Sequence, residues 1–445
     1  MLISIPLINM LRAQGFGFKS TNILSGEAYH FACYTYVDDT NLIHAGTHQT
    51  TPTQVFHDMQ NMLDHWEGGL RATGGALVPA KSFWYGIDFA WEPTSYTWRY
   101  KSIDELPGEL RIRNHRQEWE TLTRLEVSDA QETLGIFASV DGNQDAQVAK
   151  LHEKILGWAD KINTKQLTKT EIWLSLRLGI AKSLRYPLTA TTLSKTECYD
   201  LQKPLLKAAL KALGFPATFP RNVVFAPPSI LGLGVPNMWN DQGIDHITAI
   251  LKHGDSPHSN ITGCLQRDEM ARLQLELGLP ENATNYPYKK LHLCTTKVWF
   301  HITWQFCNNN KLTIKDTLPT FKLLRQHDQF IMLTFLLQGY SAKNLHMLNL
   351  CQMWVRAITL ADLTTGNGRF LQQQCRDRNY RRPPLAYEWP KTMKPDAHCW
   401  KMWLSALETC FLRPDDPHRR LRNSLGHWTH IPTNWDWFYL PTQDR

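Results

Sequence analysis

With 445 residues, 42% of them apolar and 20% charged, the chain has the composition of a core-forming globular protein of two or three domains, which excludes wholesale disorder. The net charge of +7 is unevenly spread: residues 1–100 hold five Lys/Arg and eight Asp/Glu, a net −3, which leaves +10 for the remainder. A basic carboxy-terminal part is typical of a protein that binds a polyanion, although soluble proteins often show some charge asymmetry as well.

The cysteines and the apolar runs bear on the compartment. Nine cysteines are scattered without a CxxC pair, which disfavours a zinc module or a disulfide framework and favours an intracellular setting, nucleus or cytoplasm. No run approaches the roughly 18 to 20 apolar residues of a bilayer span, so we expect no membrane partner. The apolar residues 1–10 lack a basic segment before them and indicate the end of a helix, not a signal peptide.

The first hundred residues predict an α+β fold. An aromatic, β-prone run at 31–37 meets Asp38-Asp39 and resumes as a short extended run at 40–44, which predicts a hairpin with two carboxylates at its tip. Apolar residues at helical spacing predict a helix over about 53–71. A second strand pair is expected at 82–89 and 96–100, joined by a turn at Glu92-Pro93.

Residues 145–215 are the most helical part of the sequence. Apolar side chains recur there every three or four residues, as expected for helices that each bury one face: Leu151, Ile155, Trp158, Ile162, Ile172, Leu176, Ile180, Leu184, Leu205, Leu206, Ala209, Leu210 and Leu213. Beyond about residue 285 the chain is rich in Trp, Lys, Arg and Pro, with weak helices expected near 321–338 and 343–362.

The segment Tyr36-Val37-Asp38-Asp39 is the sharpest candidate for chemistry. Adjacent carboxylates at a strand turn repel each other unless a cation relieves the repulsion. Mg²⁺ takes carboxylate oxygens together with phosphates and water, and two such ions serve nucleotidyl transfer. The alternative is structural, because Asp-Asp is also common in turns through Asx-type hydrogen bonds.

The stretch "FACYTYVDDTNLI" resembles the YxDD box of reverse transcriptases. The resemblance implies an RNA-directed DNA polymerase, a nucleotidyltransferase that uses an RNA template, a DNA primer and deoxynucleoside triphosphates. It implies that Asp38 and Asp39 are catalytic ligands of Mg²⁺ (or Mn²⁺) and that Tyr36 packs beneath the primer terminus and the nucleotide. Lys81 follows the helix and a glycine pair as the motif-D lysine does, and this implies a place beside the triphosphate.

Later segments extend the likeness. Residues from Phe83 to Tyr100 resemble the primer grip, in which Trp84, Trp98 and Arg99 would contact the primer. The helices after residue 100 lie where the family has its thumb, which implies contacts with template and primer from basic residues, among them Lys165, Lys169 and Arg177. "VVFAPPSILGLGVPNMW" is similar to a Gly-Leu-Gly segment after the polymerase of retrotransposons without long terminal repeats.

The expected architecture is α+β in three parts. Residues 1–100 form a partial palm, with an antiparallel sheet, the YxDD hairpin and a helix. Residues 101–220 form a helical thumb, and residues 221–445 a mostly helical connector to which the sequence assigns no role. The chain departs from the family because no aspartate precedes Asp38, and Glu27 is the only acidic residue before it.

The missing motif-A aspartate predicts that this polypeptide alone is an inactive fragment that depends on upstream domains of an intact retrotransposon protein. Two alternatives stay open. One is a catalytically dead, nucleic-acid-binding remnant of a retroelement. The other is a structural or interaction protein without a nucleic-acid role. No HExxH, GxxxxGK[ST] or GxSxG motif offers a competing chemistry.

Overall fold

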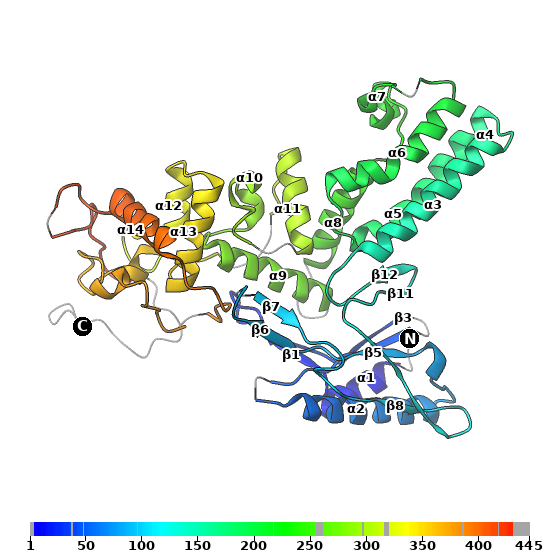
Figure 1. The fold of residues 1–445 in the computed structure, drawn as a ribbon, viewed down its shortest axis with the longest axis horizontal. Coiled ribbons are helices and arrows are strands. Elements are labelled where there is room, and N and C mark those ends of the chain that lie inside the picture. Colours follow the sequence, from blue (N-terminus) through cyan, green and yellow to red (C-terminus); the bar gives the residue numbers. More distant parts are fainter. Residues whose placement is uncertain are drawn as a thin grey trace. The chain divides into compact units, whose positions relative to one another are not determined.

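The structure is a computed structural model, drawn in Figure 1, and it describes these residues: 4–36, 39–47, 49–95, 97–216, 218–254, 261–295, 298–315, 320–384, 387–416 and 418–429. The chain divides into two compact units. The amino-terminal unit comprises Met1–Thr21 and Ala28–Asp245, and the carboxy-terminal unit comprises Asn22–Glu27 and His246–Arg445. Helices mix with short two-stranded sheets, so the α+β class is confirmed. The predicted part boundaries at 100 and 220 both fall inside the amino-terminal unit.

The first half of the amino-terminal unit alternates strands with two helices. Its elements are α1 (Ser4–Ala13), β1 (Phe18–Thr21), β2 (Ala28–Phe31), β3 (Cys33–Tyr36), β4 (Asp39–Leu42), α2 (Pro52–Ala72), the 3₁₀ turn η1 (Pro79–Lys81), β5 (Phe83–Tyr85), β6 (Phe89–Glu92), β7 (Thr97–Tyr100), β8 (Arg111–Arg113), β9 (Trp119–Thr121), β10 (Thr123–Leu125), β11 (Gln131–Thr133) and β12 (Ile136–Ala138). Sequential strands pair as antiparallel hairpins, β1–β2, β3–β4, β6–β7, β8–β9 and β11–β12, whereas β5 pairs in parallel with β10.

Helix α2 matches the predicted helix and is the support on which these strands pack. Thr51 caps it by accepting a hydrogen bond from the Gln54 backbone N–H, and a proline occupies its first turn, where no backbone donor is lost. Met62 and Trp66 pack into one apolar cluster with helix α1 and strand β3, and Leu63 packs into a second cluster with strands β5 and β8. Helix α2 therefore contributes to two neighbouring apolar clusters, which share Leu42, Met59 and Leu77.

Two sequence predictions for this region are wrong. The residues from 82 to 100 do not form one hairpin, because β5 pairs with β10 and the hairpin is β6–β7. Residues 101–144 are not helical: they form strands β8 to β12, and the helices begin at Asp145. These strands are three residues long, too short to show a clear alternation in the sequence.

The second half of the amino-terminal unit is helical. Its elements are α3 (Asp145–Thr164), α4 (Lys169–Leu174), the π-helical turn η2 (Ser175–Ile180), α5 (Ala181–Arg185), the 3₁₀ turn η3 (Tyr186–Ala190), α6 (Lys195–Ala212), α7 (Arg221–Phe225), the 3₁₀ turn η4 (Pro228–Ile230) and the start of α8 (Met238–Gly254). Helices α3 and α6 lie side by side in Figure 1 and share the largest helix contact of the described residues. Their facing side chains, such as Leu151, Ile155 and Leu205, are buried as the spacing predicts.

The carboxy-terminal unit has its own apolar core. Its elements are the end of α8, then α9 (Ile261–Leu277), η5 (Ala283–Asn285), α10 (Tyr288–Leu291), α11 (Trp299–Asn310), α12 (Ile331–Leu337), α13 (Ala342–Val355), η6 (Leu360–Leu363), η7 (Gln373–Arg376) and α14 (Ala397–Phe411). Large side chains fill the core, among them Trp304, Phe335 and Trp403. The helices expected near 321–338 and 343–362 correspond to the shorter α12 and α13. Among the described residues, no helix combines the length and apolarity needed to cross a bilayer.

Candidate functional site

The predicted hairpin is present, and its register decides which side chains share a face. Tyr36 pairs with Asp39, and Tyr34 pairs with Asn41. Directly opposed residues of an antiparallel pair point to the same side of the sheet, as do residues two apart along a strand. Tyr34, Tyr36 and Asp39 therefore line one face, and all three are exposed, Tyr36 by 60% and Tyr34 by 51%.

The opposite face of the hairpin fixes it to the protein. Cys33 and Leu42 pack against the apolar cluster formed with α1 and α2, and burial raises the pKa of the Cys33 thiol to about 11. His44, just after β4, accepts a hydrogen bond from the Gly17 backbone N–H on Nδ1 at 3.2 Å, and its Nε2 lies 3.8 Å from a carboxylate oxygen of Asp58 on α2. Burial lowers the pKa of His44, so a neutral imidazole joins the hairpin to the helix.

The two predicted metal ligands are not equally visible. Asp39 is the first residue of β4 and is exposed, whereas Asp38 lies outside the described residues, as does Val37. No group of three or more His, Cys, Asp or Glu side chains that could hold a metal ion occurs within the described ranges. In the sequence, Asp38 directly precedes Asp39.

Lys81, the predicted triphosphate contact, ends the turn η1 and is exposed. Leu77, four residues earlier, packs against the same two apolar clusters as Leu42 of the hairpin. The turn that carries Lys81 and the hairpin that carries Asp39 are thus anchored on the same cores.

Trp84, a predicted primer contact, is buried. Its side chain is only 7% exposed and packs with Leu63, Leu110 and Ile112 beneath strand β5. The Phe56 ring meets it edge-on at 5.3 Å, and the Arg124 guanidinium lies 4.7 Å from the ring centroid. The expectation that Trp84 stacks on a nucleic acid is therefore wrong for this structure, because its faces are already covered.

Trp98 and Arg99 on β7 are exposed. Trp98 is 51% exposed and packs edge-on against Trp91 with ring centroids 5.1 Å apart. Arg99 donates from Nε to Glu92 and from both terminal nitrogens to Glu105, each at 2.6 Å. Those hydrogen bonds raise the pKa of Arg99 further above its usual range. A phosphate would have to compete with these two carboxylates for Arg99.

The basic residues predicted for the helical part lie at different places. Lys165 caps the carboxy-terminal end of α3, and Lys169 begins α4. A Cβ atom built on Gly214 would lie 3.0 Å from the Lys169 ammonium nitrogen, which puts this cation beside the carboxy-terminal end of α6, where a helix dipole favours it. Arg177 lies two turns into the α4–η2 helix with its guanidinium 5.8 Å from the Trp173 ring centroid. All three are exposed.

The structure adds candidates that the sequence reading missed. Helix α6 presents exposed lysines at a spacing of four residues or a multiple of four, with Tyr199 at the position between the first two: Lys195, Lys203, Lys207 and Lys211. Residues four apart are neighbours on a helix surface, so these form a ridge that winds gradually around α6, called here the α6 lysine row. The spacing was readable from the sequence. Tyr34 was readable too, from the two-residue alternation with Tyr36.

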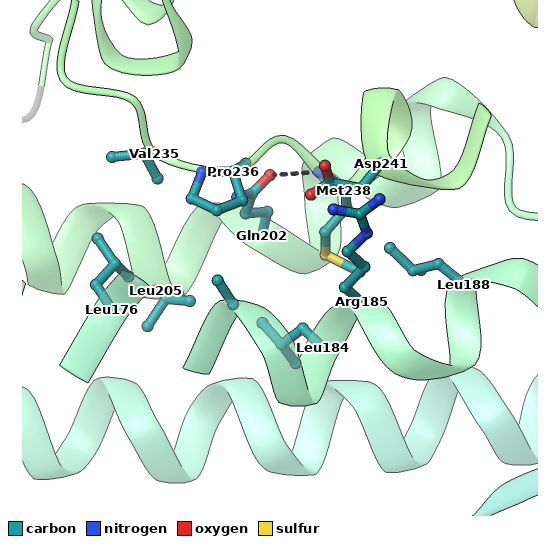
Figure 2. A pocket seen from close by; sticks show the side chains of 11 residues that line it. Leu176, Leu184, Arg185, Leu188, Gln202, Leu205, Val235, Pro236, Met238 and Asp241 are labelled. Carbon is teal, nitrogen blue, oxygen red and sulfur yellow. Dashed lines mark hydrogen bonds between the residues drawn. The ribbon is translucent and has the colours of Figure 1, made fainter. Parts of the chain in front are cut away.

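A small hollow in the helical half is lined by apolar side chains, several of them from η2, α5 and α6, and by Arg185, Gln202 and Asp241 (Figure 2). Gln202 accepts a hydrogen bond from the Met238 backbone N–H at 3.3 Å, and Arg185 donates from Nε to Asp245 at 2.8 Å. Arg185 is therefore paired with a carboxylate on α8. The hollow joins the start of α8 to α5 and α6 and is a packing junction.

Compared with known proteins, the chain matches no protein-family model and no curated protein sequence, so its assignment rests on its own residues and their geometry.

Proposed function

We propose that this chain is the palm-and-thumb part of an RNA-directed DNA polymerase, a reverse transcriptase of the type found in retrotransposons without long terminal repeats. The observation that carries the proposal is the exposed hairpin face with Tyr36 opposite Asp39, fixed from behind by α2. Its substrates would be an RNA template, a DNA primer and deoxynucleoside triphosphates, inside the cell in the nucleus or cytoplasm.

Nucleotidyl transfer requires the protein to hold carboxylates rigidly where metal ions and substrate can reach them. Nucleotidyl transfer is driven by divalent ions that bridge carboxylates and phosphate oxygens. Asp39 and its sequence neighbour Asp38 would supply carboxylates to Mg²⁺ (or Mn²⁺), and Lys81 would balance charge on the leaving pyrophosphate. The anchoring of Cys33, Leu42 and His44 supports this role, because small displacements of metal ligands cost orders of magnitude in rate.

Two carboxylates do not make a complete metal site in this family. A further aspartate from an upstream strand would have to join them, and residues 1–37 contain none. The proposal therefore includes that this polypeptide alone does not extend a primer. Full activity would need a further metal-binding carboxylate.

A second candidate function is that of a nucleic-acid-binding remnant without catalysis. The exposed α6 lysine row favours it, since cations in a row attract a phosphate backbone whether or not the hairpin binds metal. Both candidate functions include binding of nucleic acid, and they differ in whether the hairpin also binds metal ions.

Manganese binding separates them. We expect the full chain to bind Mn²⁺, measured as loss of the free Mn²⁺ electron paramagnetic resonance signal, and Asp39→Asn and Asp38→Asn each to weaken binding at least tenfold. Asp104→Asn is the matched control, because Asp104 is an exposed aspartate that does not belong to the hairpin. Equal Mn²⁺ binding by all variants, with duplex binding retained, would leave the remnant function.

A primer-extension assay tests the same proposal from the other side. With RNA template, DNA primer, deoxynucleotides and Mg²⁺, this polypeptide should give no extension. Extension that Asp38→Asn abolishes would show that the metal site is complete without upstream residues. Failure to bind an RNA–DNA hybrid even at low salt would instead support a structural protein and refute both nucleic-acid functions.

A further inference from the structure

The loop of residues 226–234 exposes two large apolar side chains at its apex. Ile230 is 69% exposed and Leu231 is 91% exposed, the highest value of any large apolar side chain among the described residues. The loop lies in the Pro-Pro-Ser-Ile-Leu-Gly-Leu-Gly segment, which the hairpin function does not use. We call it the apolar tip loop.

The apolar tip loop is held rigidly at its base. The backbone N–H groups of Leu233 and Val235 donate to the carbonyls of Val223 and Val224 at 2.8 and 3.0 Å, and Gly234 N–H donates to Ala226 at 2.8 Å. Val224 and Val235 are buried. The base of the loop is therefore ordered by backbone hydrogen bonds and buried side chains.

Close packing and backbone strain support the same reading. A Cβ atom on Gly232 would lie 2.0 Å from the Ala226 carbonyl oxygen, so only glycine fits there. Leu231 has φ +63° and ψ +21°, a left-handed conformation that is uncommon for a bulky residue. Strain of this kind persists where the surroundings enforce it, and it concentrates at binding sites.

Both ends of the loop rest on α6 beside the α6 lysine row. The Phe225 ring stacks on Tyr199 with centroids 6.4 Å apart and planes 19° apart. On the other side, Gln202 donates to the Pro236 carbonyl at 2.6 Å. Tyr199 lies one helical turn before Lys203, so the Phe225 end of the loop packs on α6 one turn from that lysine.

The charge of the residues around the apolar tip loop indicates what kind of molecule would bind there. The lysine row advances about 6 Å per four residues, and Lys195 also lies with its ammonium 5.7 Å from the Tyr199 ring centroid. The carboxylates of α6 are fewer: Glu197 is used in the amino-terminal capping box, and Asp200 is the other. A row of lysines beside exposed aliphatic side chains fits a nucleic-acid duplex. The lysines would bind the phosphates of the duplex, and the aliphatic side chains would insert between two of its base pairs.

We propose that Ile230 and Leu231 form a wedge that enters the minor groove of duplex nucleic acid and unstacks a base step, while the α6 lysine row holds the phosphates. This inference rests on the proposed function, in that it names how the helical half of the unit would hold its duplex. It assigns a role to a segment that catalysis at the hairpin leaves unexplained.

The test uses the full chain and a 24-base-pair RNA–DNA hybrid that carries 2-aminopurine, whose fluorescence rises when it is unstacked. Native protein should raise the fluorescence on binding. The double variant Ile230→Ser/Leu231→Asn should abolish the rise and weaken binding at least fivefold, with the salt dependence unchanged. Asparagine tolerates a left-handed backbone, so this variant should keep the native unfolding midpoint.

Two control variants separate the contribution of the apolar wedge from that of the lysine charges. Lys203→Gln/Lys207→Gln should flatten the slope of log affinity against log salt by about 1.8, that is about 0.9 per lysine. Leu156→Ser removes a 44% exposed leucine on α3 and should change neither fluorescence nor affinity. Tight binding by the native chain without a fluorescence rise would overturn the wedge and leave the proposed function intact. Absence of any duplex binding would overturn both.

A second copy of the chain is the competing occupant. If native protein self-associates in sedimentation velocity and the tip-loop double variant becomes monomeric, the loop is a protein interface and the wedge is refuted. A monomeric native protein whose fluorescence response depends on the loop supports it.

Discussion

Trp84 offers the sharpest contrast between what its sequence context predicts and where it lies. Replacing it with alanine should unfold the amino-terminal unit more readily, because the side chain is 7% exposed in an apolar cluster. Removing a buried tryptophan costs about 3–5 kcal/mol. Loss of the Arg124 contact at 4.7 Å adds about 0.5–1 kcal/mol.

One term opposes this cost. The indole N–H of Trp84 is buried without a hydrogen-bond partner among the described residues, and removing an unsatisfied donor returns about 1 kcal/mol. The net destabilisation is about 3–5 kcal/mol, which corresponds to a fall in melting temperature on the order of 10 °C for a unit of this size. Trp84→Phe keeps one aromatic ring in the cluster and removes the donor, so it should cost less than Trp84→Ala.

Trp98→Ala is the matched control on the same stretch of sequence. Trp98 is 51% exposed and packs against the Trp91 ring, so the cost should be about 1 kcal/mol. Thermal and urea unfolding followed by circular dichroism measure all three variants, and hybrid binding is measured in parallel. If Trp84→Ala leaves the unfolding midpoint unchanged and weakens hybrid binding, the buried assignment is wrong and the primer-contact interpretation is right.

Three further predictions concern single residues. Burial raises the pKa of Glu276 to about 7, so the folded chain keeps a proton that the unfolded chain releases above about pH 4.5. Stability of the carboxy-terminal unit should therefore fall by on the order of 1–3 kcal/mol as pH rises from 4.5 to 7.5. Glu276→Gln should remove that dependence in urea titrations, and an unchanged pH profile would contradict the assignment. Gly232→Ala should cost on the order of 2 kcal/mol, because its Cβ meets the Ala226 carbonyl; a native midpoint would show that the loop yields easily. Leu231→Gly should stabilise the folded protein by about 0.5 kcal/mol. The change removes the strain of a leucine in a left-handed conformation, and the greater conformational entropy of glycine in the unfolded chain offsets part of that gain. A lower unfolding midpoint would mean that the leucine side chain packs in the folded protein.

The parts of the fold that sequence predicts well are those whose signals are local. Helix α2 carries its own cap at Thr51, a proline in the first turn and apolar residues at helical spacing, and it was predicted to within two residues at each end. The hairpin β3–β4 was also predicted, since both strands and the turn lie within ten residues. The β5–β10 pairing was missed because Phe83 and its partner Thr123 are forty residues apart, and nothing near either strand specifies the other.

The candidate site shows the same limit at the level of side chains. Trp84 and Trp98 look alike in sequence, each on a short aromatic strand. Phe56 and Arg124, distant in sequence, cover one of them and not the other. Exposure is a tertiary property, so the sequence could nominate aromatic residues for the primer contact but could not choose between them.

The hairpin and the apolar tip loop both combine exposed side chains with a rigid attachment to a helix. Each exposes side chains to solvent, and each is held by buried or half-buried residues that pack against a helix. Leu42 and His44 do this for Asp39 through α2, while Val224, Val235 and Phe225 do it for Leu231 through α6. Because the supports are separate helices, damage to one turn should leave the other intact. Loss of Mn²⁺ binding in Asp39→Asn should therefore leave the 2-aminopurine response unchanged, and loss of that response in the tip-loop variant should leave Mn²⁺ binding unchanged.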